Sequence, residues 1–174
     1  MMYKTNYDSP VGQLLLTSDG ESLTGLWIKN QKYYLYKIDD ELIDNDDLEI
    51  FSQVKSWLDK YFNGEKIVIN NLKLKPQGTK FQKEVWKILC NIPYGETITY
   101  KDIANKITKN LRKDKMSAQA VGGAVGHNPI SIIIPCHRVV GTNGNLTGYA
   151  GGIDKKIRLL QIEGHDMTKF SYKN

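Results

Sequence analysis

From residue 132 the chain reads Ile132-Ile133-Ile134-Pro135-Cys136-His137-Arg138-Val139-Val140. Apolar β-branched residues run directly into a proline, which predicts a buried strand over residues 132–134 that ends there. The next two positions are a thiol and an imidazole. A cysteine beside a histidine is a candidate activated nucleophile, because the thiolate is the reactive form and a nearby base favours it.

Helices are predicted on both sides of this run. Their cap signals are Thr79 with Gln82 three residues later, Thr99 with Asp102, Ser117, and Asp154. These signals predict helices that begin at about residue 79, over residues 100–107, over residues 118–127, and after residue 154. Gly164 is expected to end the last helix.

The first half of the chain has a different character. Residues 12–18 and 22–28 have strand composition and flank Asp19-Gly20, a strong hairpin signal. An amphipathic helix follows an acidic stretch, and Asn63-Gly64 is expected to end it. A short strand is predicted over residues 67–69, and a linker suggests a domain boundary near residue 76. The apolar face of the helix consists of Leu48, Phe51, Val54, Trp57, Leu58, Tyr61 and Phe62.

We therefore predict an α+β protein with two domains. Residues 1–75 form a small antiparallel-sheet domain, and residues 76–174 form a winged-helix-like helix-turn-helix domain that carries the active site. The first range holds 9 Lys/Arg and 12 Asp/Glu, a net charge of −3, and the second holds 15 and 7, a net charge of +8. This asymmetry suggests that the second half meets a polyanion, although a solvated basic surface explains it equally well.

Composition limits the class of protein. Two cysteines are too few for a disulfide framework, and no apolar run approaches membrane-spanning length, so a cytoplasmic protein is expected. His127 and His165 lack partners at metal-ligand spacing, and we predict no metal and no cofactor. Cys90 lies late in an amphipathic helix and is interpreted as a small core residue.

The helix predicted over residues 118–127 has almost no side-chain bulk. Ala118, Ala120, Gly122, Gly123, Ala124 and Gly126 dominate it. Each glycine costs about 1 kcal/mol in a helix interior, so something must compensate. Two interpretations are open: close packing against a neighbouring helix, or insertion into the DNA minor groove, which is about 6 Å wide.

The cysteine needs a base and the base needs an orienting group. His137 is adjacent to Cys136, but neighbouring side chains on an extended segment point apart, so a bridging water is one way to connect them. Glu163 is the best carboxylate candidate to orient the histidine. Alone, His137 would be interpreted as a structural histidine.

The second half resembles the O6-alkylguanine-DNA alkyltransferases, also called methylated-DNA–protein-cysteine methyltransferases. The Pro135-Cys136-His137-Arg138-Val139 run is similar to that family's active-site signature. Further agreement covers residues 76–165 in the family's order. For residues 1–75 only the predicted layout is similar to the family's ribonuclease-H-like N-terminal domain. The agreeing segments are Tyr94-Gly95-Glu96, Thr99-Tyr100, Ala120-Val121-Gly122-Gly123-Ala124, Asn128-Pro129, Tyr149-Ala150-Gly151-Gly152 and Glu163-Gly164-His165.

The resemblance implies a DNA repair enzyme that acts once. It would bind duplex DNA through the minor groove as a monomer, flip O6-alkylguanine out of the stack, and transfer the alkyl group irreversibly to Cys136. O4-alkylthymine is a candidate second substrate. In the catalytic set, His137 is the base acting through water, Glu163 orients His137, and Asn128 ties the helix-turn-helix to the active-site loop.

The resemblance also assigns binding roles. Tyr100 would donate its hydroxyl to the flipped base, Tyr149 would pack on the pocket, the backbone N–H of Ala150 would bind O6, and Val139 would line the guanine edge. Arg138 is interpreted as a structural ion-pair residue. The DNA-binding set is Lys101, Ala118, Gln119, Ala120, Gly122 and Gly123.

Two features depart from the family pattern. Gln119 stands where many members carry an arginine that fills the space left by the flipped guanine. The segment 106–115, predicted as a connector, is long and holds five Lys/Arg against one Asp, which favours added phosphate contacts or a solvated loop. The first 75 residues contain no Cys or His, so the structural zinc of some relatives cannot form there.

Three other classes of protein share parts of this pattern. A lesion-binding protein without catalysis would look similar but would lack the reactive cysteine, which is present here. A winged-helix regulator with Cys136 as a redox sensor would need residues that read base edges, and the bare helix over residues 118–127 does not supply them. A cysteine hydrolase fits least, since no oxyanion hole is evident.

Overall fold

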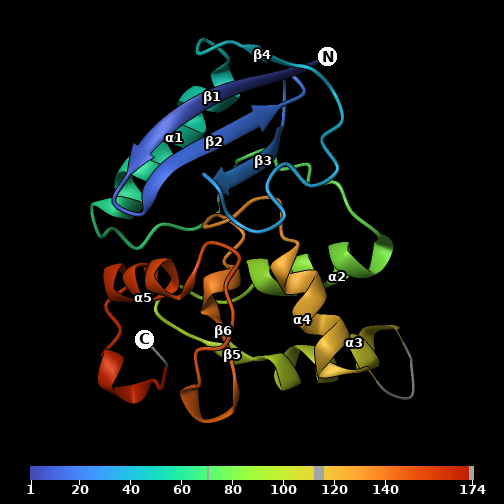
Figure 1. Cartoon of the computed structure of the whole chain (residues 1–174), viewed down its shortest axis with the longest axis vertical. Helices are drawn as coiled ribbons and strands as arrows, with labels where there is room; N and C mark the ends of the chain where they lie inside the picture. Colours follow the sequence, from blue (N-terminus) through green and yellow to red (C-terminus); the bar gives the residue numbers. More distant parts are fainter. Residues whose placement is uncertain (70, 112–115, 173–174) are drawn as a thin grey trace.

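The computed structural model describes residues 1–69, 71–111 and 116–172. The N-terminal half holds β1 (Met2–Ser9), β2 (Gly12–Ser18), β3 (Leu23–Ile28), β4 (Leu42–Asp44) and α1 (Glu49–Phe62). The C-terminal half holds α2 (Lys80–Cys90), β5 (Ile98–Thr99), α3 (Tyr100–Leu111), α4 (Ala118–Gly126), β6 (Val139–Val140) and α5 (Ile153–Ile162). The described residues also form 3-10 turns, namely η1 (Cys136–Arg138), η2 (Thr142–Gly144) and η3 (Met167–Lys169). Figure 1 shows the sheet and α1 at one end of the molecule and α2 to α5 at the other.

The N-terminal sheet has the strand order β3-β2-β1-β4. The predicted hairpin is confirmed as β2 and β3, which pair antiparallel around the turn that contains Gly20. β1 pairs antiparallel with β2, and β4 adds a short parallel edge strand to β1. The sequence did not predict β1 or β4, because β1 is rich in polar residues and β4 lies within the acidic stretch.

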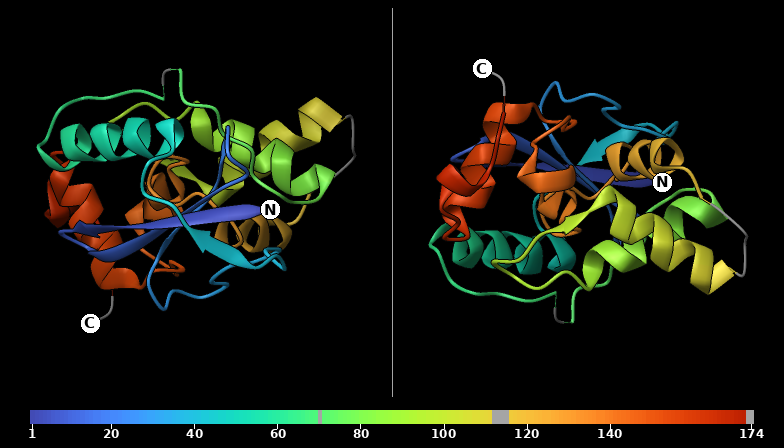
Figure 2. Two further views of the ribbon diagram at one scale, coloured as in Figure 1. Left: turned by 90° about the horizontal axis from the view of Figure 1, so that it is seen from above. Right: turned by 90° about the horizontal axis from the view of Figure 1, so that it is seen from below.

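The predicted apolar face of α1 is confirmed as part of the core, and the helix lies against this sheet (Figure 2). Asn63 is its C-cap, and Gly64 follows with φ of 82°, which ends the helix as expected. The strand predicted over residues 67–69 is wrong. Instead, the backbone carbonyl of Val68 accepts a hydrogen bond of 2.9 Å from the indole N–H of Trp57, so this segment is held to the helix.

The outer edge of β3 is covered by two segments from elsewhere in the chain. Leu23 exchanges backbone hydrogen bonds of 2.8 Å with Lys73 and Lys75. Leu26 exchanges bonds of 2.8 and 2.9 Å with Pro129 and Ser131, directly before the active-site run. Pairing removes the exposed edge, and it fixes the segment leading to Cys136 against the N-terminal sheet.

Helices α2, α3 and α4 pack together in the C-terminal half. The capping box of Thr79 and Gln82 is formed, and Thr99 and Asp102 exchange backbone-to-side-chain bonds at the start of α3. Helix α3 extends to Leu111, so residues 106–111 are helix and that part of the predicted connector is wrong. Residues 112–115 of it lie outside the described residues. Cys90 is exposed at the end of α2, so its interpretation as a core residue is also wrong.

The last helix is capped differently from the prediction. Gly152, with φ of 99°, is the N-cap of α5, and Asp154 lies in the first turn, where its carboxylate faces the positive end of the helix. Gly164 follows the C-cap with φ of 86°, as expected. A two-residue parallel ladder joins β5 to β6 and forms a small sheet element in the C-terminal half. The α+β class is confirmed. No helix in the described ranges is long and apolar enough to cross a membrane.

Candidate active site

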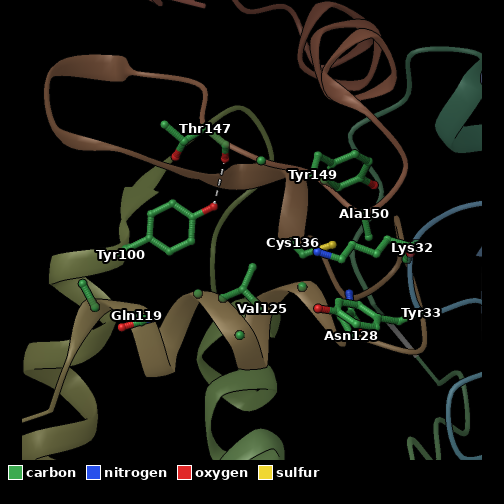
Figure 3. Close-up of a pocket in the computed structure, with 16 residues that line it drawn as sticks. Lys32, Tyr33, Tyr100, Gln119, Val125, Asn128, Cys136, Thr147, Tyr149 and Ala150 are labelled. Carbon is green, nitrogen blue, oxygen red and sulfur yellow. Dashed lines mark hydrogen bonds between the residues drawn. The ribbon is translucent and has the colours of Figure 1, made fainter.

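Cys136 lies at the bottom of a pocket of about 690 Å³ (Figure 3). Helix α4 forms one wall, Tyr100 and the loop over residues 147–150 form another, and Lys32 and Tyr33 reach in from the N-terminal half. The lining residues are Lys32, Tyr33, Tyr100, Ala118, Gln119, Gly122, Gly123, Val125, Gly126, Asn128, Ser131, Cys136, Thr147, Gly148, Tyr149 and Ala150. Most of the predicted site residues therefore meet around one cavity.

The run that leads to Cys136 is a buried turn and not a strand, so the prediction for residues 132–134 is wrong. Ile132 is fully buried with φ of 73°, a left-handed conformation that is costly for a β-branched residue. Asn128 holds both ends of this turn. Its side-chain amide donates to the carbonyl of Ile134 at 2.8 Å, and its side-chain oxygen accepts from the N–H of Ile130 at 3.0 Å. Asn128 thus links the end of α4 to the cysteine segment.

The thiol of Cys136 is held in its protonated form at rest. Burial raises its pKa, and interactions with Asn128, Lys156 and Tyr149 offset this only in part. Since the thiolate is the nucleophile, a base must take the proton when the thiol reacts.

His137 is fully buried behind Cys136 and faces Glu163. Its Nε2 donates to Oε2 of Glu163, which leaves Nδ1 as the unprotonated nitrogen of the neutral ring. Within the described ranges, Nδ1 is buried without a hydrogen-bond partner. Burial lowers the pKa of His137 despite the opposing effect of Glu163, so the ring is neutral near pH 7 and can accept a proton.

Glu163 is fixed from several sides. Its Oε1 accepts from the Nε of Arg138 at 2.7 Å and from the backbone N–H of Gly95 at 3.3 Å. Arg138 in turn donates to the carbonyl of Ile92 at 2.8 Å, which agrees with the ion-pair role expected for it. Burial alone would raise the pKa of Glu163, but the charges and hydrogen bonds of His137 and Arg138 outweigh it and hold that pKa well below its usual range.

The residues expected to contact the substrate lie on the other side of the sulfur. The hydroxyl of Tyr100 donates to the carbonyl of Thr147 at 3.4 Å, and burial, reinforced by Cys136, raises its pKa to about 12. The hydroxyl of Tyr149 is buried near Cys136, and it makes no hydrogen bond of normal geometry in the described part of the chain. Ala150 lines the pocket. Val139 is fully buried and does not line the pocket. Its carbonyl accepts a hydrogen bond of 2.6 Å from the Nζ of Lys156.

Helix α4 presents its bare face to the pocket. A Cβ placed on Gly122 or Gly123 would meet no atom within 4 Å, so close packing within the chain does not explain these glycines. The opposite face is packed, and the indole N–H of Trp86 donates to the carbonyl of Ala124 at 2.9 Å. Of the predicted DNA-binding set, Ala118, Gln119, Gly122 and Gly123 line the pocket, whereas Ala120 and Lys101 are exposed outside it.

Sequence reasoning missed several residues at this site. Tyr61 from α1 bonds to the Glu163 carboxylate, but its spacing marked it only as a core residue. Lys156 is fully buried, although a Lys-Lys pair on a helix normally indicates solvent. Tyr33 stacks on His127 with ring centroids 3.6 Å apart, and neither residue carried a motif.

Comparison with known proteins agrees with this geometry. Residues 80–165 match the model described as "6-O-methylguanine DNA methyltransferase, DNA binding domain", and residues 2–76 match its "ribonuclease-like domain".

Individual proteins extend the likeness over nearly the whole chain. The methylated-DNA–protein-cysteine methyltransferase of Haemophilus influenzae is 44% identical over 162 residues, which are 93% of this chain and 86% of that protein. The one from Methanosarcina acetivorans is 46% identical, with 94% and 99% covered. The crystal structure of Mycobacterium tuberculosis OGT in complex with DNA superposes with a TM-score of 0.79 at 39% identity, with 97% of this chain and 94% of that chain covered. The chain therefore belongs to the 6-O-methylguanine DNA methyltransferase family, as its active-site run predicts.

Proposed function

We propose that this protein repairs DNA by moving the alkyl group of O6-alkylguanine to Cys136, in a single irreversible turnover. One observation carries the proposal. Cys136 lines a pocket that has the bare face of α4 as one wall, and the adjacent His137 is hydrogen-bonded to Glu163. Relatives named as methylated-DNA–protein-cysteine methyltransferases support it.

Binding to DNA begins at α4. The open space over Gly122 and Gly123 suits a groove too narrow for large side chains, and the net charge of +8 over residues 76–174 favours the phosphate backbone. The target base must leave the stack to reach a cysteine that is 5% exposed, so base flipping through the minor groove is part of the proposal. The solved DNA complex of the Mycobacterium tuberculosis relative supports DNA binding.

Activation of the thiol follows from the tautomer of His137. A water between the sulfur and Nδ1 passes the thiol proton to the imidazole, while Nε2–H stays hydrogen-bonded to Glu163. The carboxylate stabilises the imidazolium that forms. Asn128 contributes by holding the turn and by favouring the thiolate.

Transfer is an in-line displacement. The thiolate attacks the carbon on O6, so that a C–S bond forms and the C–O bond breaks with its electron pair going to guanine. Tyr100, protonated at neutral pH, donates a hydrogen bond to the leaving purine, and the Ala150 N–H binds O6. The thioether has no easy reversal, so each molecule acts once.

The environment of Cys136 disfavours the alternative role of a redox sensor. Sensor cysteines are exposed and have a lowered pKa, whereas Cys136 is buried and its pKa is raised.

The test is to follow the lesion with two matched variants. A duplex that contains O6-methylguanine is incubated with the wild type, with Cys136→Ala and with Cys90→Ala, and the remaining lesion is measured by digestion and mass spectrometry. The wild type and Cys90→Ala should remove it, and Cys136→Ala should not. The proposal fails if the lesion persists with the wild type, or if Cys136→Ala still removes it. A second arm with O4-methylthymine measures the substrate range.

A further inference from the structure

We propose that Tyr61 of α1 is a positioning residue of the proton relay. Its hydroxyl holds the Glu163 carboxylate against His137 and limits how strongly that carboxylate stabilises the imidazolium. The inference rests on the proposed function, and it makes the N-terminal half of the chain a contributor to the chemistry at Cys136.

The geometry is that of a buried three-membered cluster. Tyr61 is fully buried, and its hydroxyl lies 2.7 Å from Oε2 of Glu163 and 3.4 Å from Nε2 of His137. In Figures 1 and 2 the last turns of α1 lie beside α5, at whose end Glu163 stands. Among the hydrogen bonds of the described residues, Tyr61 is the residue of the N-terminal half that bonds to the His137–Glu163 pair.

The direction of the hydrogen bond follows from the protonation states. Burial, together with the Glu163 charge, raises the pKa of Tyr61 well above its ordinary value, so the phenol keeps its proton. An ionised carboxylate only accepts, and therefore Tyr61 donates to Oε2. The phenol cannot itself take up or release the proton of Cys136 near neutral pH.

This donor completes the set around the carboxylate. Tyr61 and His137 donate to Oε2, while Arg138 and Gly95 donate to Oε1, so four donors meet about four lone-pair sites. If one of these hydrogen bonds is removed, the negative charge of the buried carboxylate is stabilised by fewer donors.

The ring stack around Tyr61 fixes the direction of its hydroxyl. Trp57 stacks on it with centroids 5.4 Å apart at 8°, and Tyr94 contacts it edge-on at 6.3 Å. The titratable and charged groups that face His137 are Tyr61 from α1, Arg138 from the active-site run, Lys156 from α5, and Glu163 at its end.

The consequence for catalysis has a definite sign. Without the phenol, the Glu163 carboxylate is a stronger acceptor and stabilises the imidazolium more, so the pKa of His137 rises. His137 acts as a base only when it is neutral. As the pH is lowered, the alkylation rate of a protein without the Tyr61 hydroxyl therefore falls at a higher pH than that of the wild type. The acid limb of the rate profile should move up by about half to one pH unit, since a hydrogen bond to a charged group is worth roughly one to two pKa units at most.

The experiment compares two tyrosines that each lose only a hydroxyl. Tyr61→Phe removes the donor to Glu163. Tyr94→Phe, the matched control, removes a hydroxyl that donates to the backbone carbonyl of Ile162 at 3.2 Å. First-order alkylation of each protein is measured from about pH 5 to 9 with saturating O6-methylguanine duplex, so that DNA affinity drops out. Thermal unfolding of both variants reports the structural cost.

On the acid limb Tyr61→Phe should react about three- to tenfold slower than the wild type, and the two should converge at high pH. Tyr94→Phe should keep the wild-type limb. In a Glu163→Gln background, Tyr61→Phe should produce no further shift of the limb, since the charge on which the phenol acts is gone.

Three results would overturn the inference. They are an unchanged limb in Tyr61→Phe, an equal shift in Tyr94→Phe, and a Tyr61→Phe protein that is unfolded while Glu163→Gln folds, which would make the phenol a fold residue. Each requires a wild type that transfers the methyl group. A wild type that does not react contradicts the proposed function instead, so the two failures are distinguishable.

Discussion

Lys156 is the clearest case of a single residue whose surroundings alter its chemistry. Its side chain is fully buried, and its Nζ donates to the Val139 carbonyl at 2.6 Å. Burial lowers its pKa to about 8, and the nearby Cys136 offsets only part of this. The amine holds the strand that follows the cysteine and places a positive charge near the sulfur, so it supports the site at a cost in stability.

That cost predicts an unusual dependence of stability on pH. The unfolded chain keeps the lysine proton up to about pH 10.4, whereas the folded protein releases it near pH 8. Between these values the unfolded state binds more protons, so the free energy of unfolding rises with pH, by on the order of 3 kcal/mol in total. Burial of the Cys136 thiol, which raises its pKa, has the opposite effect on stability over the same range, so the difference between two proteins is the measurement. Urea unfolding at pH 7.5, 8.5 and 9.5 should give a free energy of unfolding whose slope with pH is more positive in the wild type than in Lys156→Met. Equal slopes in the two proteins would contradict it.

At the scale of the element, α4 separates two tasks on opposite faces. One face packs through Val121 and Ala124, and the other presents Gly122 and Gly123 to open space. The small residues are therefore costly for the helix and useful only if something outside the chain approaches.

Adding bulk to the open face tests this separation. Gly123→Leu should keep or raise stability, by up to about 1 kcal/mol, because a helix glycine is replaced and the added Cβ meets no atom within 4 Å. The same change should slow reaction with O6-methylguanine in duplex DNA at least tenfold, while reaction with the free base falls much less. Gln53→Leu at an exposed position of α1 is the control for added apolar surface. Comparable losses on duplex and free base would show that α4 does not dock the duplex.

Gln119 stands at the mouth of the pocket and supplies neither charge nor a large planar surface. If flipping limits the duplex reaction, Gln119→Arg should accelerate repair of duplex DNA more than reaction with free O6-methylguanine. Second-order rate constants for both substrates are the measurement. An equal change in the two rate constants would show that residue 119 does not control base flipping.

The sequence predicted elements well where local chemistry decides them. Side chains of Thr79, Thr99 and Ser117 cap their helices as expected, because capping depends on residues three positions apart. It failed at residues 132–134, because an apolar run has no periodicity that separates a buried strand from a buried turn. That turn is held by the nearby side chain of Asn128 and, from about a hundred residues away along the chain, by the edge of β3.

The site shows the same division. Cys136, His137, Glu163 and Asn128 could be named from motifs and lie together in the structure. Tyr61 could not, since its role depends on α1 meeting α5 across the molecule, a contact between residues 102 positions apart.

Over the whole molecule, one apolar core runs from the sheet through α1 and α2 to the active-site run. Leu26 pairs with the segment before Cys136, and Tyr61 bonds to the relay, so the N-terminal half supports the site from two directions. The boundary near residue 76 stays a prediction. The basic half carries the pocket mouth, which agrees with a site that meets a polyanion there.

The most direct test of the central claim is a stoichiometric one. The protein is mixed with excess duplex that carries O6-methylguanine with a deuterated methyl group, and intact and peptide masses are followed to completion. We expect one labelled methyl per protein, on the peptide that contains Cys136, with no further loss of lesion after that point. A second turnover, or a label on the Cys90 peptide, would contradict a cysteine that accepts one alkyl group and keeps it.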